Sequence, residues 1–212
     1  MRIDRIGKLG WVVAAALAGI LLGGGFQADT NKFGVVDFAA VVEKSDYYKN
    51  GETQVKAMQA TREGVLEFLF TYKVATSEQA QKLRTLSLKD NLNGTEKQEL
   101  EKIKADVKEA DKSDKQLATK PNPTADDTNL MRDYANRKRS TEELLGRWQQ
   151  EFEQELQKRF QEMRSTAVER ARQSVAEVGK SGGYTIVYRA DVAPYGANDL
   201  TDAALKSMNA KK

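Results

Sequence analysis

The fold is decided by residues 124–178, which read TADDTNLMRDYANRKRSTEELLGRWQQEFEQELQKRFQEMRSTAVERARQSVAEV. This stretch contains no proline, and its single glycine, Gly146, is compatible with a helix. A continuous helix of this length, rising about 1.5 Å per residue, reaches on the order of 80 Å. Because that length exceeds the diameter of a compact domain of this size, we expect the helix to project as an arm.

Apolar residues recur along one face of this helix at spacings of three and four residues, which is typical of a coiled-coil seam. From Trp148 onward the steps lengthen to 4, 4, 4 and 3, which predicts a straight or right-handed seam. Two polar residues, Lys138 and Thr141, interrupt the first half of the seam. We expect this face to pack against a second helical limb.

That second limb precedes the long helix in the chain. The segment near residues 119–124 holds two of the three prolines and predicts the turn between the limbs. The limb has helical periodicity that is interrupted near Thr76 and Asn91, and its first seam contains one basic residue, Arg62. The arm is therefore expected to be a helical hairpin over residues 50–179, with a more elaborate outline than two plain limbs.

Three signals of helix starts lie within the arm, each with a threonine three positions before a side chain that can cap the helix. They are Thr76 with Gln79, Thr95 with Gln98, and Thr124 with Asp127. We expect a new helix to begin at each of them.

The segments that flank the arm carry short strand signals. Phe33–Phe38 predicts a buried strand, followed by a short helix over Ala39–Lys49 and a break at Asn50–Gly51. After the arm, Tyr184–Tyr188 and Val192–Tyr195 predict two further strands.

A last short helix is expected to carry Leu200, Ala204 and Met208 on one face. Residues 29–49 and 180–212 would then form a small β body. The predicted fold class is α+β and mostly α, in which the two chain ends form the body and the helical-hairpin, coiled-coil arm projects from it.

Residues 1–28 have the features of a secretory signal. Three basic residues precede an uninterrupted apolar run, Trp11–Leu22, which is shorter than the roughly 20 residues that span a membrane. Cleavage is expected after Gly25 or Ala28, and an uncleaved membrane anchor is the alternative. Either outcome predicts an exported protein.

The composition excludes most catalytic chemistry. The 212 residues include no cysteine and no histidine, so the chain has no thiolate or imidazole to bind a metal or to act as nucleophile or base. Neither glycine cluster is followed by the lysine of a phosphate-binding loop. We expect no catalytic residues, no metal and no cofactor, and therefore a protein that is not an enzyme.

The charge distribution argues against nucleic acid as a partner. Residues 50–118 carry 12 basic and 12 acidic side chains, and residues 119–179 carry 11 of each, within a net charge of +3 for the whole chain. The one dense basic cluster, Arg137–Arg139, is followed by acidic residues at helical spacing. Such a mixed face is typical of a solvated helix rather than of a nucleic-acid site.

The predicted body is too small to fold alone without a covalent or metal staple. Since the chain has no cysteine, we expect identical subunits to associate through the body and to cover its free strand edges. The residues predicted to form this oligomeric body are Val35, Val36, Phe38, Ile186, Val187, Tyr188 and Tyr195.

Three segments, Gly34–Phe38, Tyr184–Tyr195 and Asp199–Met208, together with the signal and the arm, resemble the Skp/OmpH-like periplasmic chaperones. The resemblance implies a homotrimer in which terminal strands form a small barrel and three arms enclose a cavity. It also implies an ATP-independent periplasmic holdase that binds unfolded outer-membrane proteins in that cavity.

Two features depart from the family's pattern. Arms in the family tend to be strongly basic, whereas this arm is neutral. Capture of clients by charge, lipopolysaccharide binding and contact with a membrane surface therefore do not carry over. The acidic strand end of the family is replaced here by Val187–Arg189, so the contacts of that acid do not carry over either.

One segment of the first limb has more apolar residues than a single seam requires. The surplus either packs against the partner helix and the body, or it lines the cavity and contacts clients through non-directional apolar burial. The residues predicted for client contact are Leu66, Phe68, Phe70 and Tyr72, with Phe68 and Phe70 foremost.

The alternative function is that of a structural coiled-coil adaptor or spacer of the cell envelope. Such a protein would bind one specific folded partner and would be indifferent to unfolded chains. A carboxylate-based glycosidase is disfavoured, because the acidic residues are evenly mixed with basic residues along solvated helices.

Overall fold

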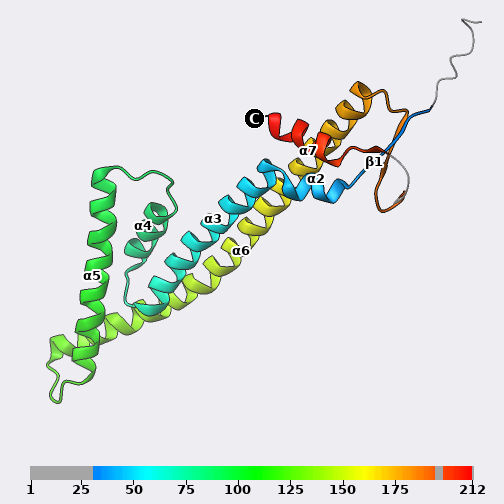
Figure 1. The fold of residues 1–212 in the computed structure, drawn as a ribbon. Coiled ribbons are helices and arrows are strands. Elements are labelled where there is room, and N and C mark those ends of the chain that lie inside the picture. The colour runs from blue at the N-terminus through cyan, green and yellow to red at the C-terminus, as the bar shows by residue number, and fades with distance from the viewer. Residues whose placement is uncertain (1–30, 194–197, 212) are drawn as a thin grey trace, which may run out of the picture. The chain divides into compact units, whose positions relative to one another are not determined.

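The computed structural model describes residues 31–193 and 198–211. The predicted signal, residues 1–28, lies outside this range. Of the described residues, those up to Val41 and those from Ala171 onward form one compact unit, and Val42–Arg170 form another. The predicted fold class is confirmed: the chain is mostly helical, with a long helical arm and a small sheet made by the chain ends (Figure 1).

The unit made by the chain ends contains a three-stranded parallel sheet. Its strands are β1 (Phe33–Val36), β2 (Ile186–Arg189) and β3 (Asn198–Asp199), in the order β2-β1-β3. Phe33 is paired with Ile186, and Gly34 with Asn198. Parallel strands need a long crossover connection, and here the whole helical arm is the crossover between β1 and β2.

All three strand predictions differ from the structure in their bounds. The strand predicted at Tyr184–Tyr188 is present as β2, two residues later at its start and one at its end. β1 ends before the predicted Phe38 because Asp37 caps helix α2 (Phe38–Lys44), its carboxylate accepting a 2.9 Å bond from the Ala40 amide. The strand predicted at Val192–Tyr195 is wrong in its two described residues, because their amides donate to the Arg189 carbonyl at 2.9 and 3.1 Å and form a turn. The other two residues of that segment lie outside the described range.

Helix α7 (Thr201–Ala210) packs its apolar face inward in this unit, as predicted. Leu200, Ala204 and Met208 are buried. Gly34 lies so close to the Leu200 side chain that a Cβ at this position would collide with it. The absence of a side chain on β1 therefore allows α7 to pack closely against the sheet.

The helical unit is built from α3 (Asp46–Thr71), α4 (Ser77–Ser87), α5 (Gly94–Ala118) and most of α6 (Ala125–Ser181). Two predicted helix starts are confirmed by reciprocal caps. The Gln79 amide donates to Thr76 Oγ1 (3.1 Å) and the Asp127 amide donates to Thr124 Oγ1 (3.2 Å). In return, the Thr76 amide donates to the Gln79 side chain and the Thr124 amide donates to the Asp127 carboxylate.

Two helix boundaries differ from the prediction. Helix α3 runs through Asn50–Gly51 and begins after Ser45, whose hydroxyl accepts a bond from the amide three residues on. Helix α5 begins after Asn93 rather than after Thr95, and Asn93 Oδ1 accepts a 2.9 Å bond from the Glu96 amide. In both places a strong N-cap residue lies a few positions earlier and sets the start of the helix.

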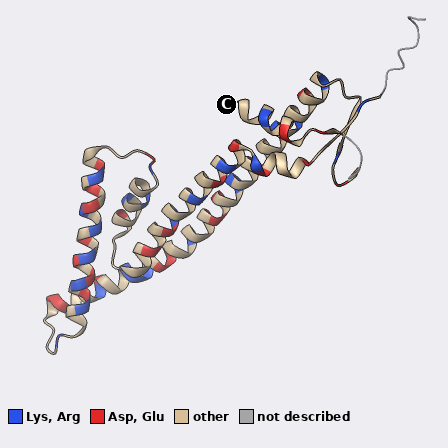
Figure 2. Cartoon of the chain, in the orientation of Figure 1, with Lys and Arg blue, Asp and Glu red and all other residues tan. Residues whose placement is uncertain are grey.

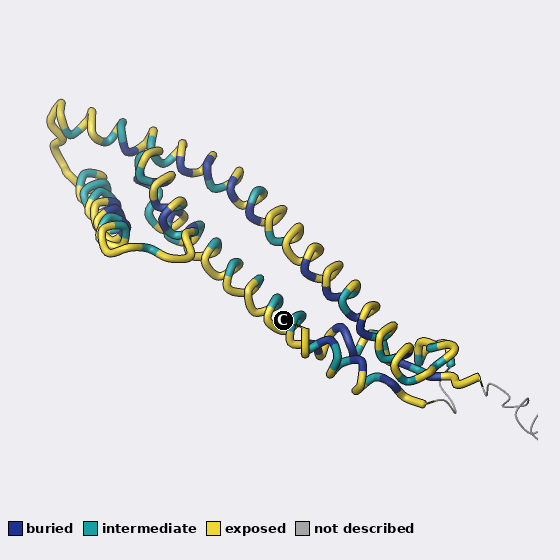
Figure 3. Tube along the Cα trace, turned by 90° about the horizontal axis from the view of Figure 1, so that it is seen from above, coloured by how far each residue is buried: buried dark blue, intermediate teal, exposed yellow. Residues whose placement is uncertain are grey.

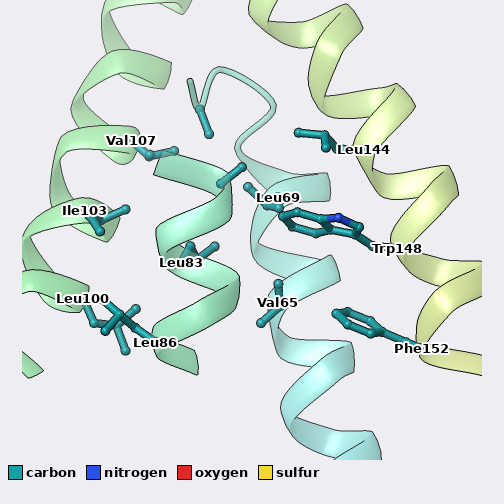
Figure 4. Packing of buried hydrophobic residues seen from close by; sticks show 12 residues of the cluster. Val65, Leu69, Leu83, Leu86, Leu100, Ile103, Val107, Leu144, Trp148 and Phe152 are labelled. Atoms are coloured by element: carbon teal, nitrogen blue, oxygen red, sulfur yellow. The ribbon is translucent and has the colours of Figure 1, made fainter. Parts of the chain in front are cut away.

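The core of the helical unit forms where α4 and α5 pack beside α3 and α6 (Figure 4). Trp148 of α6, 1% exposed, points toward the fully buried Leu69 of α3. The buried members of this core cluster are Val65, Leu69, Ala75, Ala80, Leu83, Leu86, Leu100, Ile103, Val107, Leu144, Trp148 and Phe152. Along the rest of α6, buried positions recur between exposed ones, as expected of a seam (Figure 3).

Two of the polar residues that interrupt the predicted seams, Arg62 and Lys138, have partners on the facing helices. Arg62 of α3 pairs with Glu155 of α6 at 2.8 Å, and Lys138 of α6 pairs with Asp114 of α5 at 2.5 Å. The third interruption, Thr141, is 1% exposed, and its hydroxyl has no hydrogen-bond partner among the described residues. Two of the three interruptions therefore join helices across the seam.

Candidate functional site

One face of the small sheet exposes large apolar side chains. Phe33 of β1 is 41% exposed, and Ile186 and Tyr188 of β2 are 43% and 38% exposed. The Phe33 and Tyr188 rings lie 6.3 Å apart. Side chains alternate between the faces of a strand, so Val35 lies on this open face and Val36, 2% exposed, lies on the covered one. This open apolar face resembles a docking surface more than an ordinary solvated face.

The covered side of β2 borders a hollow of about 380 Å³. Six of the residues that line it are Phe38, Val175, Ala176, Gly179, Tyr184 and Val187. The residues predicted for the oligomeric body are thus divided: Val35, Ile186 and Tyr188 share the open face, Val36 is in the core, and Phe38 and Val187 line the hollow. Tyr195 lies outside the described residues. Their role in association stays a prediction.

The residues predicted for client contact on α3 separate into two groups. Leu66, Phe68 and Tyr72 are half-buried and pack against the core cluster, with the Phe68 and Tyr72 rings 5.0 Å apart. Phe70 is 67% exposed, and Lys73 Nζ lies 5.0 Å from the centre of its ring. The surplus apolar surface of α3 is therefore largely covered by packing within the arm, and Phe70 is left open. Client contact stays a prediction for all four residues.

The arm carries both signs of charge mixed along every helix (Figure 2). Arg84 of α4 contacts three residues of α6. It pairs with Glu151 at 2.7 Å, and its guanidinium lies 5.0 Å from the Trp148 ring and 4.9 Å from the Phe152 ring. Sequence reasoning missed Arg84. The sequence feature that could have predicted this contact is the position of Arg84 next to Leu83, on the apolar side of a short amphipathic helix. A balanced surface of this kind exerts little long-range attraction on a charged partner.

The turn between α5 and α6 holds one strongly shifted carboxylate. The Lys120 ammonium, 2.5 Å from Asp127 Oδ2, is the largest cause, and the amide and hydroxyl of Thr124 add to it. Together they lower the pKa of Asp127 from 3.8 to about 2. The folded turn therefore prefers the ionised carboxylate, so its stabilisation is present above the ordinary pKa and is lost as the pH falls toward about 2.

Replacing Lys120 with alanine should raise the pKa of Asp127 back toward 3.8, because the largest cause of the shift is then gone. A carboxyl-carbon NMR titration would measure the change. Asp199 is the internal control, since the Thr201 hydroxyl and amide lower its pKa in the other unit and the substitution does not touch them. An Asp127 pKa that stays at about 2 in Lys120→Ala would contradict the assigned cause.

Within residues 31–193 and 198–211, no three or more acidic side chains gather in a way that could hold a metal ion. In the same part of the chain, no helix is both long enough and apolar enough to cross a membrane.

Comparison with protein families places the chain in one of them. A family model described as "Outer membrane protein (OmpH-like)" matches residues 32–208, which include every described strand and nearly all of the helical chain. No curated protein matches this sequence.

Proposed function

The chain belongs to the OmpH-like family, and from this premise we propose that it is an ATP-independent holdase chaperone of the periplasm. Membership supports a periplasmic, chaperone-type role in general. The holdase mechanism and the class of client, unfolded outer-membrane proteins, are the proposal. It further includes a homotrimer whose arms surround the client.

The observation that carries the proposal is the open apolar face of the sheet. Phe33, Ile186 and Tyr188 stand exposed on a sheet whose strands have only four, four and two residues. Three such short strands bury too little apolar surface to form a stable core alone, and the chain has no cysteine with which to form a disulfide. Copies of the chain that cover this face would complete the core and bring several arms together.

The arm supplies the second part of the argument. Its residues 50–179 carry equal numbers of basic and acidic side chains, and cross-helix pairs such as Arg62–Glu155 use many of them. A client would therefore be held by apolar contact rather than by charge, which suits clients that share no sequence motif. Exposed Phe70 is the clearest such contact on the arm.

The test of this function is an aggregation assay with the exported protein. A urea-unfolded outer-membrane β-barrel protein is diluted into buffer without ATP, with and without the chaperone, while light scattering and the mass of the complex are recorded. We expect delayed aggregation and a complex of one trimer with one client. Scattering that is unchanged by the chaperone would overturn the holdase, and retention by one folded envelope protein would favour the adaptor.

Replacing Phe70 with serine should weaken the suppression of aggregation, because it removes the most exposed aromatic contact of α3. The amount of chaperone that gives half suppression should rise by about two- to tenfold, since part of one aromatic burial is lost. Phe70 lies outside the core cluster, so the free energy of unfolding should change by less than about 0.5 kcal/mol.

Phe160→Ser on α6 is the matched control, because Phe160 is also partly exposed, at 37%. Phe68→Ser is a poorer test, since Phe68 packs against the core cluster and its loss would also affect folding. Equal suppression by wild type and Phe70→Ser would remove Phe70 from the client-contact surface.

A further inference from the structure

We propose that a groove between α3, α4 and α5 seats one aromatic side chain of an unfolded client. This inference rests on the proposed function and adds a defined binding site to it. The groove lies wholly within the helical unit, and none of the comparisons assigns it a role.

The groove has a volume of about 220 Å³. The residues of α3 that line it include three small ones, Ala60, Thr61 and Gly64, and one aromatic residue, Phe68. At Gly64 a Cβ would meet only open space out to 4 Å. The absence of a side chain at Gly64 therefore leaves space in the groove.

The size of the groove suits a single ring. An apolar protein cavity of about 150 Å³ is large enough to take up benzene, and this groove, at about 220 Å³, is larger and open to solvent. Leu83 of α4, which is 2% exposed, also lines it. The Thr61 hydroxyl already donates to the Ala57 carbonyl at 3.0 Å, so it does not offer a free donor to a polar ligand.

The charge of the groove favours an aromatic ring over an aliphatic chain. Lys104 of α5 is the one charged residue among those described that line it. A lysine ammonium is attracted to the electron-rich face of a ring, and the arm repeats this arrangement nearby: Lys108 lies 5.9 Å from the Tyr72 ring and Lys73 lies 5.0 Å from the Phe70 ring. Lys104 also pairs with Glu101 at 2.9 Å; the Lys104 side chain is half-buried and that of Glu101 is exposed, and such a pair near the surface holds the lysine only weakly.

The occupant follows from the proposed clients. Strands of outer-membrane barrels carry belts of aromatic side chains near both membrane interfaces. In an unfolded barrel these rings are exposed and recur at intervals along the chain. One ring could enter the groove, where Phe68 offers an aromatic wall and Lys104 offers a cation.

The experiment titrates the full exported protein with two soluble peptides. Both have the same Gly/Ser-rich sequence with glutamates beside the central position, which is phenylalanine in one peptide and alanine in the other. Methyl NMR follows Ala60 and Leu83, which line the groove. We expect the phenylalanine peptide to shift both methyl signals and to bind about tenfold or more tightly than the alanine peptide.

The matched variants are Gly64→Leu and Gly146→Leu. Both glycines lie in helices with open space at the Cβ position, but only Gly64 lies in the groove. Leucine at Gly64 should fill the groove and reduce the affinity for the phenylalanine peptide by about tenfold, whereas Gly146→Leu should leave it unchanged. Ser87→Leu, which enters the same groove from α4, provides a second filled variant should Gly64→Leu misfold.

The two proposals fail in different ways. Equal binding of the two peptides, or equal binding by Gly64→Leu, Ser87→Leu and wild type, would overturn the groove while leaving the holdase assay untouched. Specific binding of the phenylalanine peptide together with no effect on client aggregation would overturn the holdase function and leave the groove as a peptide site.

Discussion

Replacing Trp148 with alanine should lower the free energy of unfolding of the helical unit by about 3–5 kcal/mol, the range for large aromatic deletions from a core. Trp148 is 1% exposed and lies in the cluster that joins four helices. The substitution also removes one of the two rings that lie beneath the Arg84 guanidinium. Urea unfolding followed by circular dichroism would measure the loss.

Phe160→Ala is the control for this prediction, because it deletes an aromatic ring from the same helix at a position that is 37% exposed. Its cost should be about 1–2 kcal/mol, below the range for Trp148→Ala, because the ring is smaller and already partly exposed. Similar losses for the two variants would mean that the cluster around Trp148 is not the main source of stability in the arm.

Replacing Ile186 and Tyr188 together with aspartate should abolish the proposed self-association. Both side chains lie on the open face of the sheet, and two carboxylates there would have to be desolvated in any interface. Burial of unpaired charge costs several kcal/mol per ion, which corresponds to a loss of at least about a thousandfold in affinity between subunits. Sedimentation velocity over a concentration series would show monomers in place of the proposed trimer.

Phe70→Asp serves as the control, since it places the same charge on an exposed aromatic position of the arm. It should leave the sedimentation coefficient of the oligomer unchanged. The sheet face would lose its assigned role if the double aspartate variant still formed a wild-type oligomer. The same variants, if monomeric, would also show whether client holding needs several arms.

Local signals in the sequence predicted a large part of the fold. The run from Thr124 to Val178 has no proline and a steady apolar stripe, and the structure has helix α6 there, with its N-cap at the predicted residue. The polar interruptions at Arg62 and Lys138 were visible in the seams, and both form pairs across helices. These features depend on neighbours within one or two turns, which a sequence displays directly.

Features that depend on tertiary packing were not predictable in the same way. Asn50–Gly51 has the composition of a break, yet α3 continues there because Gly51 lets the helix pass closely against Met163. The sequence left open whether the surplus apolar residues of α3 pack against other helices or contact clients, and only the position of α4 and α5 shows that Leu66 and Phe68 pack within the arm. Residues of three helices line the groove, so the sequence of any one helix does not predict it.

The parallel pairing of β1 with β2 also sets the order in which this chain can fold. Lys32 and Gly182 are joined by a 2.9 Å hydrogen bond although 150 residues separate them. Closing so large a loop is entropically costly and slow in a flexible chain. Within the helical unit, however, Arg170 lies 4.3 Å from the Tyr47 ring, so the folded helical hairpin holds its two ends close together and shortens the loop that the strands must close. Because β1 pairs with Ile186–Arg189, it has no partner on that edge until nearly the whole helical hairpin has followed it along the chain.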